Sequence, residues 1–306
     1  MAYYREKHTY IVVMGATGTG KSTFIRNCSN QDVKASRELE SCTAEIQEVV
    51  FMHNSSVVHL IDTPGFDDSS RYDADVLADV ADWLAETYHK NMLLNGIVYL
   101  HSINGTRMSG TDNRNLTMFK NLCGENAYQG VVLATTGWPE NGVGDHEYRE
   151  HQLMTKPEYW GTMCQNGSQV LRLMNTRLSA LSLVDYIQSL DKKTVLKIQE
   201  QMVDQKLALP QTAAGGALDA ELAKQMKEFS ASMARIEKRL EQAISDRDYG
   251  MRKVYLDRIA EMDAMMSKVN EDRRILRDND RPVRLSERIG RRVGRTAERL
   301  FVRMGL

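Results

Sequence analysis

Gly15-Ala16-Thr17-Gly18-Thr19-Gly20-Lys21-Ser22 fits the pattern G-x-x-x-x-G-K-S/T without a mismatch, and it directly follows the apolar run 10–14 (YIVVM). Such a run is typical of a strand buried on both faces. Glycines let the backbone bend so tightly that its N–H groups converge and can surround a polyphosphate. We expect Lys21 to contact the β- and γ-phosphates and Ser22 to bind Mg²⁺, and the helix that begins here, with Thr23, adds its positive dipole end. The sequence therefore predicts a phosphate-binding loop at residues 15–22.

A second motif agrees with the first. Asp62-Thr63-Pro64-Gly65 follows the apolar run 57–61, about 40 residues after the lysine. By itself, DTPG is an ordinary turn sequence. After a phosphate-binding loop, an acidic residue at a strand end can hold Mg²⁺ through water, and the Gly65 amide can reach the γ-phosphate. We therefore interpret Asp62 as a metal-binding residue and Gly65 as the residue that senses the terminal phosphate.

The first 190 residues alternate strand-like and helix-like segments. Apolar runs at 97–100, 131–134 and 170–174 predict further strands, and segments 76–88, 113–122 and 179–190 have apolar residues at helical spacing. Segment 44–52 is expected to pair with 57–61 as a hairpin through Asn54 and Ser55. This pattern predicts an α/β fold with a six-stranded, mostly parallel sheet.

The sequence changes character after Leu190. Strand-like runs stop, and we divide the rest into a helix and linker (191–216), a heptad-containing helical region (217–280) and a basic tail (281–306). Apolar residues recur at alternating steps of four and three over 222–240 and again over 255–269, with Gly250 between them. These helices could form an intermolecular coiled coil, fold back on each other with the bend at Gly250, or pack onto the α/β domain.

The basic tail carries eight arginines against two glutamates. A basic amphipathic helix can lie on an anionic membrane surface or dock on an acidic partner. Gly290 and Gly294 weaken this helix, so a solvated tail is the simpler alternative.

Composition narrows the class of protein further. A net charge of −1 gives no reason to expect nucleic acid as a partner. The four cysteines show no CxxC spacing, so we expect reduced thiols. We recognise neither a signal peptide nor an apolar membrane-spanning run, so we expect a cytoplasmic protein, with the basic tail as a peripheral membrane contact.

The two motifs together resemble those of translation-factor-related GTPases. The phrase 62–68 (DTPGFDD) resembles the septin, chloroplast-import-receptor and immunity-associated branch of that class. Residues 39–43 (LESCT), 60–68 (LIDTPGFDD), 96–103 (GIVYLHSI) and 131–138 (VVLATTGW) are similar to uncharacterised fungal G-domain proteins of this branch. The resemblance implies a P-loop NTPase G domain that uses GTP or GDP with Mg²⁺. It also implies that Thr43 is the switch I threonine that closes over Mg²⁺ and the γ-phosphate.

Two positions depart from the pattern of that class. Phe66 stands where Ras-like enzymes have a water-orienting glutamine, so we expect slow hydrolysis unless a partner or second copy supplies the missing group. The base-reading motif N/T-K-x-D corresponds here to 135–138 (TTGW), in which Trp138 cannot accept hydrogen bonds from guanine. We still expect Thr135 and Trp138 on the base side, where the Trp138 ring can pack near a purine; the simpler alternative is that Trp138 is a core residue. Asn175 and Thr176 follow the last strand and are expected to contact the base instead.

Five further side chains are candidates for roles at the phosphates. Arginines can stabilise the charge that develops during hydrolysis, and His101 ends the fourth strand at the edge where the nucleotide is expected. Each of them also has a simpler interpretation, as a surface charge or as a strand-end histidine without a catalytic role. The arginine candidates are Arg37, Arg71, Arg107 and Arg114.

The sequence thus favours a regulatory GTPase with a low intrinsic rate that forms a homodimer or higher assembly through the G domain or the helices. Two alternatives stay open. Phe66 is also compatible with a non-hydrolysing, nucleotide-dependent scaffold, and TTGW is also compatible with an ATP-using protein.

Overall fold

The computed structural model describes residues 7–30, 46–67, 71–105, 108–139 and 144–280. Its centre is a six-stranded sheet with the strand order β2-β3-β1-β4-β5-β6, in which β2 alone is antiparallel to its neighbour. The strands are β1 (Lys7–Gly15), β2 (Gln47–His53), β3 (Ser56–Asp62), β4 (Gly96–Ser102), β5 (Val131–Thr136) and β6 (Gln169–Arg172). The predicted mostly parallel sheet is confirmed.

The β2–β3 hairpin turns at the residues expected from the sequence. Asn54 and Ser55 both have positive φ angles, of 49° and 58°. Two consecutive left-handed residues match the right-handed twist of the flanking strands, and asparagine tolerates this conformation well. The hairpin gives the sheet its antiparallel edge.

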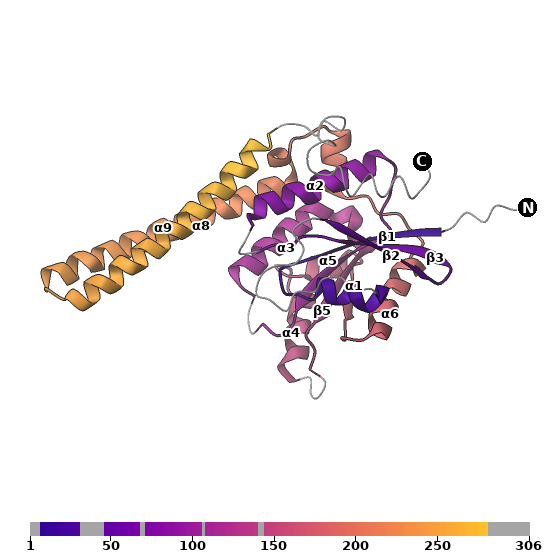
Figure 1. The fold of residues 1–306 in the computed structure, drawn as a ribbon, viewed down its shortest axis with the longest axis horizontal. Helices are drawn as coiled ribbons and strands as arrows, with labels where there is room; N and C mark the ends of the chain where they lie inside the picture. Colours follow the sequence, from indigo (N-terminus) through magenta and orange to yellow (C-terminus); the bar gives the residue numbers. More distant parts are fainter. Residues whose placement is uncertain (1–6, 31–45, 68–70, 106–107, 140–143, 281–306) are drawn as a thin grey trace, which may run out of the picture.

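Helices cover both faces of the sheet (Figure 1). Because successive strand residues point to opposite faces, Ile11 and Val13 of β1 pack with α1 (Lys21–Ser29) and α6 (Arg177–Ser189). Val12 and Met14 lie in the opposite core, with α2 (Asp73–His89) and α3 (Gly110–Cys123). A parallel sheet buried on both faces brings the carboxyl ends of β1, β3, β4 and β5 to one edge.

Between β5 and β6 lie α4 (Gly144–Thr155) and the short α5 (Gly161–Gln165), neither of which the sequence analysis predicted. The sequence of α4, GDHEYREHQLMT, is polar; of its apolar side chains Leu153 is buried, whereas Tyr148 and Met154 are exposed. Apolar periodicity is therefore too weak to reveal this helix. Short helical turns connect the other elements: η1 (Glu125–Gly130), α7 (Lys197–Gln199), η2 (Glu200–Asp204) and η3 (Leu209–Gln211).

Two long helices, α8 (Ala213–Ser245) and α9 (Tyr249–Asp278), form a hairpin that we call the helical arm. At 1.5 Å per residue, they are about 50 and 45 Å long. Figure 1 shows the arm projecting from the side of the domain that carries α2 and α3. Its base is anchored, since Leu218, Leu222, Val269 and Leu276 are buried in the core that contains α2 and α3. Of the three expected arrangements, the structure therefore combines the fold-back with packing onto the α/β domain.

The ends of the arm helices differ from the sequence-based expectation in two places. Gly215 and Gly216, expected in the break before the long helix, lie in the first turn of α8, which Thr212 caps by accepting a hydrogen bond from the Gly215 N–H (3.1 Å). The bend is not at Gly250. It lies before α9, where Arg247 has a φ of 55° and Asp248 caps α9 by accepting from the Met251 N–H (2.9 Å). Aspartate is a favoured N-cap residue, so Asp248 sets the start of α9, and Gly250 lies inside the helix.

In the described ranges, no helix is both long and apolar enough to cross a membrane. Cys28, Cys123 and Cys164 are free thiols, and burial raises the pKa of Cys28 to about 12. The basic tail and Cys42 lie outside the described residues.

Candidate nucleotide-binding site

The phosphate-binding loop connects β1 to α1 as predicted. The backbone of this loop takes positive φ angles at Gly15 (144°) and Gly20 (97°), a conformation that favours glycine. A Cβ on Gly15 would also lie 2.5 Å from the carbonyl oxygen of Leu100 in β4. The loop therefore lies directly against the neighbouring strand, and only glycine permits that approach.

Lys21, the first residue of α1, folds back over this loop. Its Nζ donates hydrogen bonds to the carbonyl oxygens of Gly15 and Ala16, each at 3.0 Å. Lys21 is only 7% exposed, whereas Thr17 and Gly18 at the tip of the loop are exposed. The loop thus presents its outer backbone to solvent and holds an ammonium group beneath it, an arrangement that suits a multiply charged anion.

The DTPG motif lies against the same loop. Asp62 is fully buried at the end of β3, in register with Val13 of β1. The Thr17 N–H donates to the carbonyl oxygen of Phe66 (3.0 Å). A Cβ on Gly65 would lie 2.8 Å from the Thr17 nitrogen and 2.9 Å from Lys21 Nζ. The structure therefore brings the two predicted motifs into contact, and Gly65 is the residue at which they meet.

The donor atoms fit Mg²⁺. Ser22 lies half-buried in the first turn of α1 and Asp62 at the end of β3, so a hydroxyl and a carboxylate come from the two motifs. Among the described residues, no group of three or more His, Cys, Asp or Glu side chains could hold a metal ion. Mg²⁺ commonly takes few protein ligands and keeps water and phosphate oxygens. Thr43, predicted as a further ligand, lies outside the described residues.

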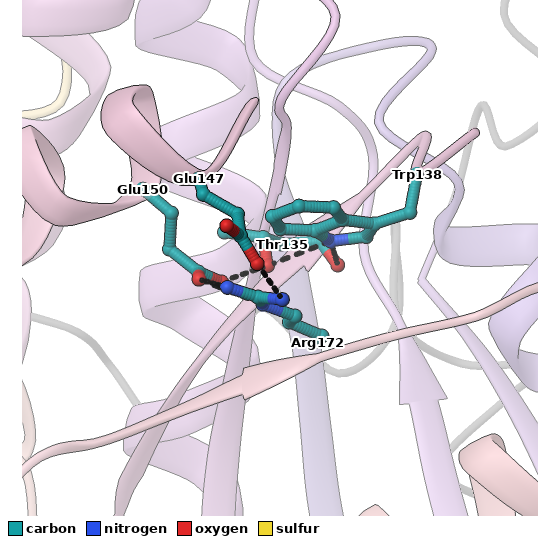
Figure 2. Close-up of polar contacts among 5 residues, drawn as sticks. All are labelled: Thr135, Trp138, Glu147, Glu150 and Arg172. Atoms are coloured by element: carbon teal, nitrogen blue, oxygen red, sulfur yellow. Dashed lines mark hydrogen bonds and ion pairs between the residues drawn. The ribbon is translucent and has the colours of Figure 1, made fainter. Parts of the chain in front are cut away.

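At the end of β5, Trp138 turns inward. Its Nε1 donates to the carbonyl oxygen (3.2 Å) and to Oγ1 (3.0 Å) of Thr135, and the Arg172 guanidinium lies 4.3 Å from the centre of its ring (Figure 2). Thr136 Oγ1 donates to the Thr19 carbonyl oxygen (2.8 Å). The end of β5 is therefore attached to the phosphate-binding loop, and the base-contacting role of Thr135 and Trp138 stays a prediction.

Glu147 and Glu150 of α4 complete this cluster (Figure 2). Arg172 of β6 forms ion pairs with Glu150 (2.7 Å) and Glu147 (3.1 Å), and Thr135 Oγ1 donates to Glu150 (2.9 Å). The hydrogen bonds to Glu150 and Glu147 raise the pKa of Arg172 above its ordinary value. Sequence reasoning missed these three residues. The only available signal was the spacing of the two glutamates, three residues apart on one face of a helix.

Asn175 contacts α1. Its Oδ1 accepts from Asn27 Nδ2 (3.0 Å), and Arg177 donates to the Cys28 carbonyl oxygen (2.8 Å) at the end of α1. Thr176 caps α6 by accepting from the Ser179 N–H (3.2 Å). The loop after β6 is therefore held by α1 and α6, and the base-contacting role of Asn175 and Thr176 stays a prediction.

Residues 10–115 match the family model described as 50S ribosome-binding GTPase. The structure of Toc33 from Arabidopsis thaliana in complex with GDP and Mg²⁺ aligns with a TM-score of 0.50 and 12% identity, over 62% of this chain and 88% of Toc33. The fold is that of a P-loop GTPase G domain. A structure of the chloroplast translocon components atToc33 and psToc159, whose dimerization is described as important for GTPase activity, aligns with a TM-score of 0.51 and 13% identity, over 62% and 87% of the two chains. No curated protein matches the sequence significantly.

Within the G domain, Phe66 is a core residue. It is 1% exposed and belongs to the hydrophobic core that contains α2 and α3. Its backbone touches the phosphate-binding loop while its ring points into the protein. The ring therefore neither accepts nor donates a hydrogen bond to an attacking water.

The other candidates for phosphate roles have structural partners. Arg114 is 9% exposed and forms an ion pair with Asp73, so it is not a surface arginine that another copy could use. Arg71 pairs with Asp79 (2.6 Å). His101 packs edge-on against Trp160, with 5.8 Å between ring centres, and burial lowers its pKa. Arg37 and Arg107 lie outside the described residues.

Proposed function

We propose that this chain is a GTP-binding protein that takes Mg²⁺ with the nucleotide, hydrolyses it slowly and acts as a nucleotide-controlled switch. One observation carries the proposal. Gly65 of the DTPG motif lies against Thr17 and Lys21 of the phosphate-binding loop, so the groups that bind and sense the terminal phosphate are already assembled. The G-domain fold and the family match over residues 10–115 support guanine as the base.

Each group has a role that follows from its chemistry. The backbone N–H groups of residues 15–20 and the Lys21 ammonium would neutralise the β- and γ-phosphates. The Ser22 hydroxyl and, through water, the Asp62 carboxylate would hold Mg²⁺, which would supply further neutralising charge to the same phosphates. Thr43 would close over the metal and the γ-phosphate, and the Gly65 N–H would distinguish triphosphate from diphosphate. Thr135, Trp138 and Asn175 would line the base side.

Slow hydrolysis follows from Phe66. Its buried ring leaves the residue after Gly65 unable to orient water, so the rate depends on a group from elsewhere. We propose that a second copy supplies it across the nucleotide face, where a residue acting in trans can raise the rate by about 10³–10⁵. The dimerization described for the Toc proteins is a precedent of the same fold.

A non-hydrolysing scaffold is the second candidate. The buried Phe66 ring favours it, and so does the helical arm, which offers an assembly surface independent of catalysis. In that case bound nucleotide would stabilise the G domain without being consumed. Single-turnover hydrolysis at low and high protein concentration separates the candidates, because a dimer-dependent GTPase accelerates with concentration and a scaffold shows no turnover at either.

The nucleotide itself is tested by denaturing freshly purified protein and identifying what is released. GTP or GDP supports the proposal, and ATP or ADP overturns it in favour of an adenine-nucleotide protein. Lys21→Ala should weaken triphosphate binding by roughly 100-fold, because removing one partner of a buried charge pair costs about 2–5 kcal/mol. Arg26→Ala, an exposed cation on the same helix, is the matched control and should bind as the parent does.

We further propose a cytoplasmic protein whose basic tail (281–306) contacts an anionic membrane surface. Sedimentation with phosphatidylserine vesicles, compared with neutral vesicles, tests this. Binding that persists after deletion of the tail would contradict it.

A further inference from the structure

The base of the helical arm touches the first turn of α2, the helix that follows the DTPG motif. The Ala74 N–H donates a hydrogen bond to Asp272 Oδ1 of α9 (2.9 Å), a residue 198 positions further along the chain. The first N–H groups of a helix have no partner within the helix and need an acceptor from outside. Among the residues that the structure describes, the side chain of the N-cap residue Tyr72 makes no such bond. Asp272 therefore acts as a cap for α2, supplied by the arm.

A short series of contacts links this cap to the phosphate-binding loop. Asp73, next to Ala74, accepts a hydrogen bond from the Asp67 N–H (2.9 Å). Asp67 follows Phe66, whose carbonyl oxygen accepts from the Thr17 N–H (3.0 Å). These hydrogen bonds would therefore transmit a displacement of Gly65 and its neighbours, relative to the phosphate-binding loop, to the first turn of α2. The Ala74 N–H would pass it on to Asp272.

The cap lies in a buried cluster with an excess of carboxylates. Asp272 is 4% exposed and Asp73 is 5% exposed, and Arg114 of α3 forms an ion pair with Asp73. Burial and the neighbouring Asp73 raise the pKa of Asp272 to about 6, although the Ala74 N–H, Arg114 and Lys268 oppose the shift. Burying a carboxylate beside another carboxylate offsets much of what the cap contributes.

Near Asp272, α9 is joined both to the core that contains α2 and to α8. Val269 and Leu276, on the same side of α9, are buried in the core that also contains α2. Arg273 binds Asp219 of α8 through two hydrogen bonds (2.8 and 3.2 Å). Because α9 is fixed both to α2 and to α8, a displacement at the first turn of α2 would move the base of both arm helices. The stretch of α9 from Asp272 to the tip at Tyr249, about 35 Å long, would enlarge that displacement at the tip.

We propose that Asp272 is a positioning residue that couples the orientation of the helical arm to the nucleotide bound in the G domain. This inference rests on the proposed function. Because coupling between two sites is reciprocal, whatever binds or restrains the arm must also shift the preference of the G domain between triphosphate and diphosphate.

The test compares three full-length variants with the parent. Asp272→Ala removes the cap, whereas Asp272→Asn keeps a side-chain oxygen that can accept from Ala74. Arg274→Ala is the matched control, because Arg274 is an exposed residue of the same helix whose ion pairs, among the described residues, are with Glu271 and Asp278 of that helix. Affinities for GDP and for a non-hydrolysable GTP analogue, together with hydrogen exchange of residues 266–278, are measured for each.

For the parent and Arg274→Ala, we expect exchange of residues 266–278 to differ between the two nucleotides. Asp272→Ala should abolish this difference and change the ratio of the two affinities about fivefold or more, and Asp272→Asn should largely restore both. Equal exchange in the two nucleotide states of the parent, or an unchanged affinity ratio in a folded Asp272→Ala protein, overturns the coupling while leaving nucleotide binding intact. If Asp272→Ala does not fold, the difference in the parent's exchange between the two nucleotides decides. Failure of the parent to bind either nucleotide refutes the proposed function instead, and the coupling with it.

Discussion

Gly65 has room for a hydrogen atom but not for a methyl group, and this makes Gly65→Ala a direct test of the contact between the two motifs. The new Cβ would lie 2.8 Å from the Thr17 nitrogen and 2.9 Å from Lys21 Nζ. The lysine end is flexible and can move, but the Thr17 backbone is part of the tight loop and cannot yield alone. The two loops must therefore separate, which also strains the hydrogen bond from Thr17 to the Phe66 carbonyl oxygen.

Overpacking of this kind typically costs about 1–3 kcal/mol. If the cost falls on the arrangement that binds the γ-phosphate, triphosphate affinity drops roughly 5- to 150-fold. Diphosphate affinity should fall less, because GDP has no γ-phosphate for Gly65 to contact. The two affinities are measured by competition with a fluorescent nucleotide, and thermal unfolding is followed in parallel.

Gly216→Ala is the control for this experiment. Gly216 lies in α8 with no atom within 4 Å of an added Cβ, so alanine there should leave both affinities unchanged and stabilise the helix by up to about 1 kcal/mol. A Gly65→Ala protein that binds both nucleotides and unfolds like the parent would refute our account of how the motifs meet.

Three further predictions concern the core and the base side. Phe66→Gln should lower the melting temperature without raising single-turnover hydrolysis, because the side chain lies in the core; a faster rate would contradict this placement. Trp138→Ala should remove the surface on which Arg172 stacks and change the ratio of GTP to ATP affinity, and a parent-like ratio would exclude Trp138 from base selection. For Asp272, the folded pKa of about 6 exceeds its ordinary value of 3.8, so its contribution to stability is complete below pH 3.8 and is lost as the pH rises through 6. Urea unfolding at pH 5 and pH 8 should therefore show that the free energy of unfolding of Asp272→Asn rises relative to that of the parent at pH 8, by about 1.4 kcal/mol. A pH-independent difference would contradict the shift. The charged groups that face Asp272 are Asp73, Arg114 and Lys268.

Much of the fold could be predicted because its signals are local. Five strands were expected from apolar runs, and β2 was expected as the hairpin partner of β3, with the turn at Asn54 and Ser55. The helix α4 could not be expected, since its sequence is mostly polar and its contacts with the domain are largely polar, so it carries little apolar periodicity. The bend of the arm was placed at Gly250 because glycine breaks helices, whereas the capping hydrogen bond of Asp248, which sets the actual start of α9, depends on a geometry that composition does not display.

The sequence by itself determined the phosphate-binding loop and the DTPG motif, because both are contiguous stretches whose backbone conformation follows from their own glycines, lysine and strand ends. The tertiary structure alone decided which distant side chains meet. The cluster of Arg172 with Glu147 and Glu150, and the cap that Asp272 provides for α2, join segments far apart in the chain. Such contacts depend on how helices pack across the sheet. A glutamate or aspartate that forms one has the same local sequence signature as an exposed one, so only the packed fold distinguishes them.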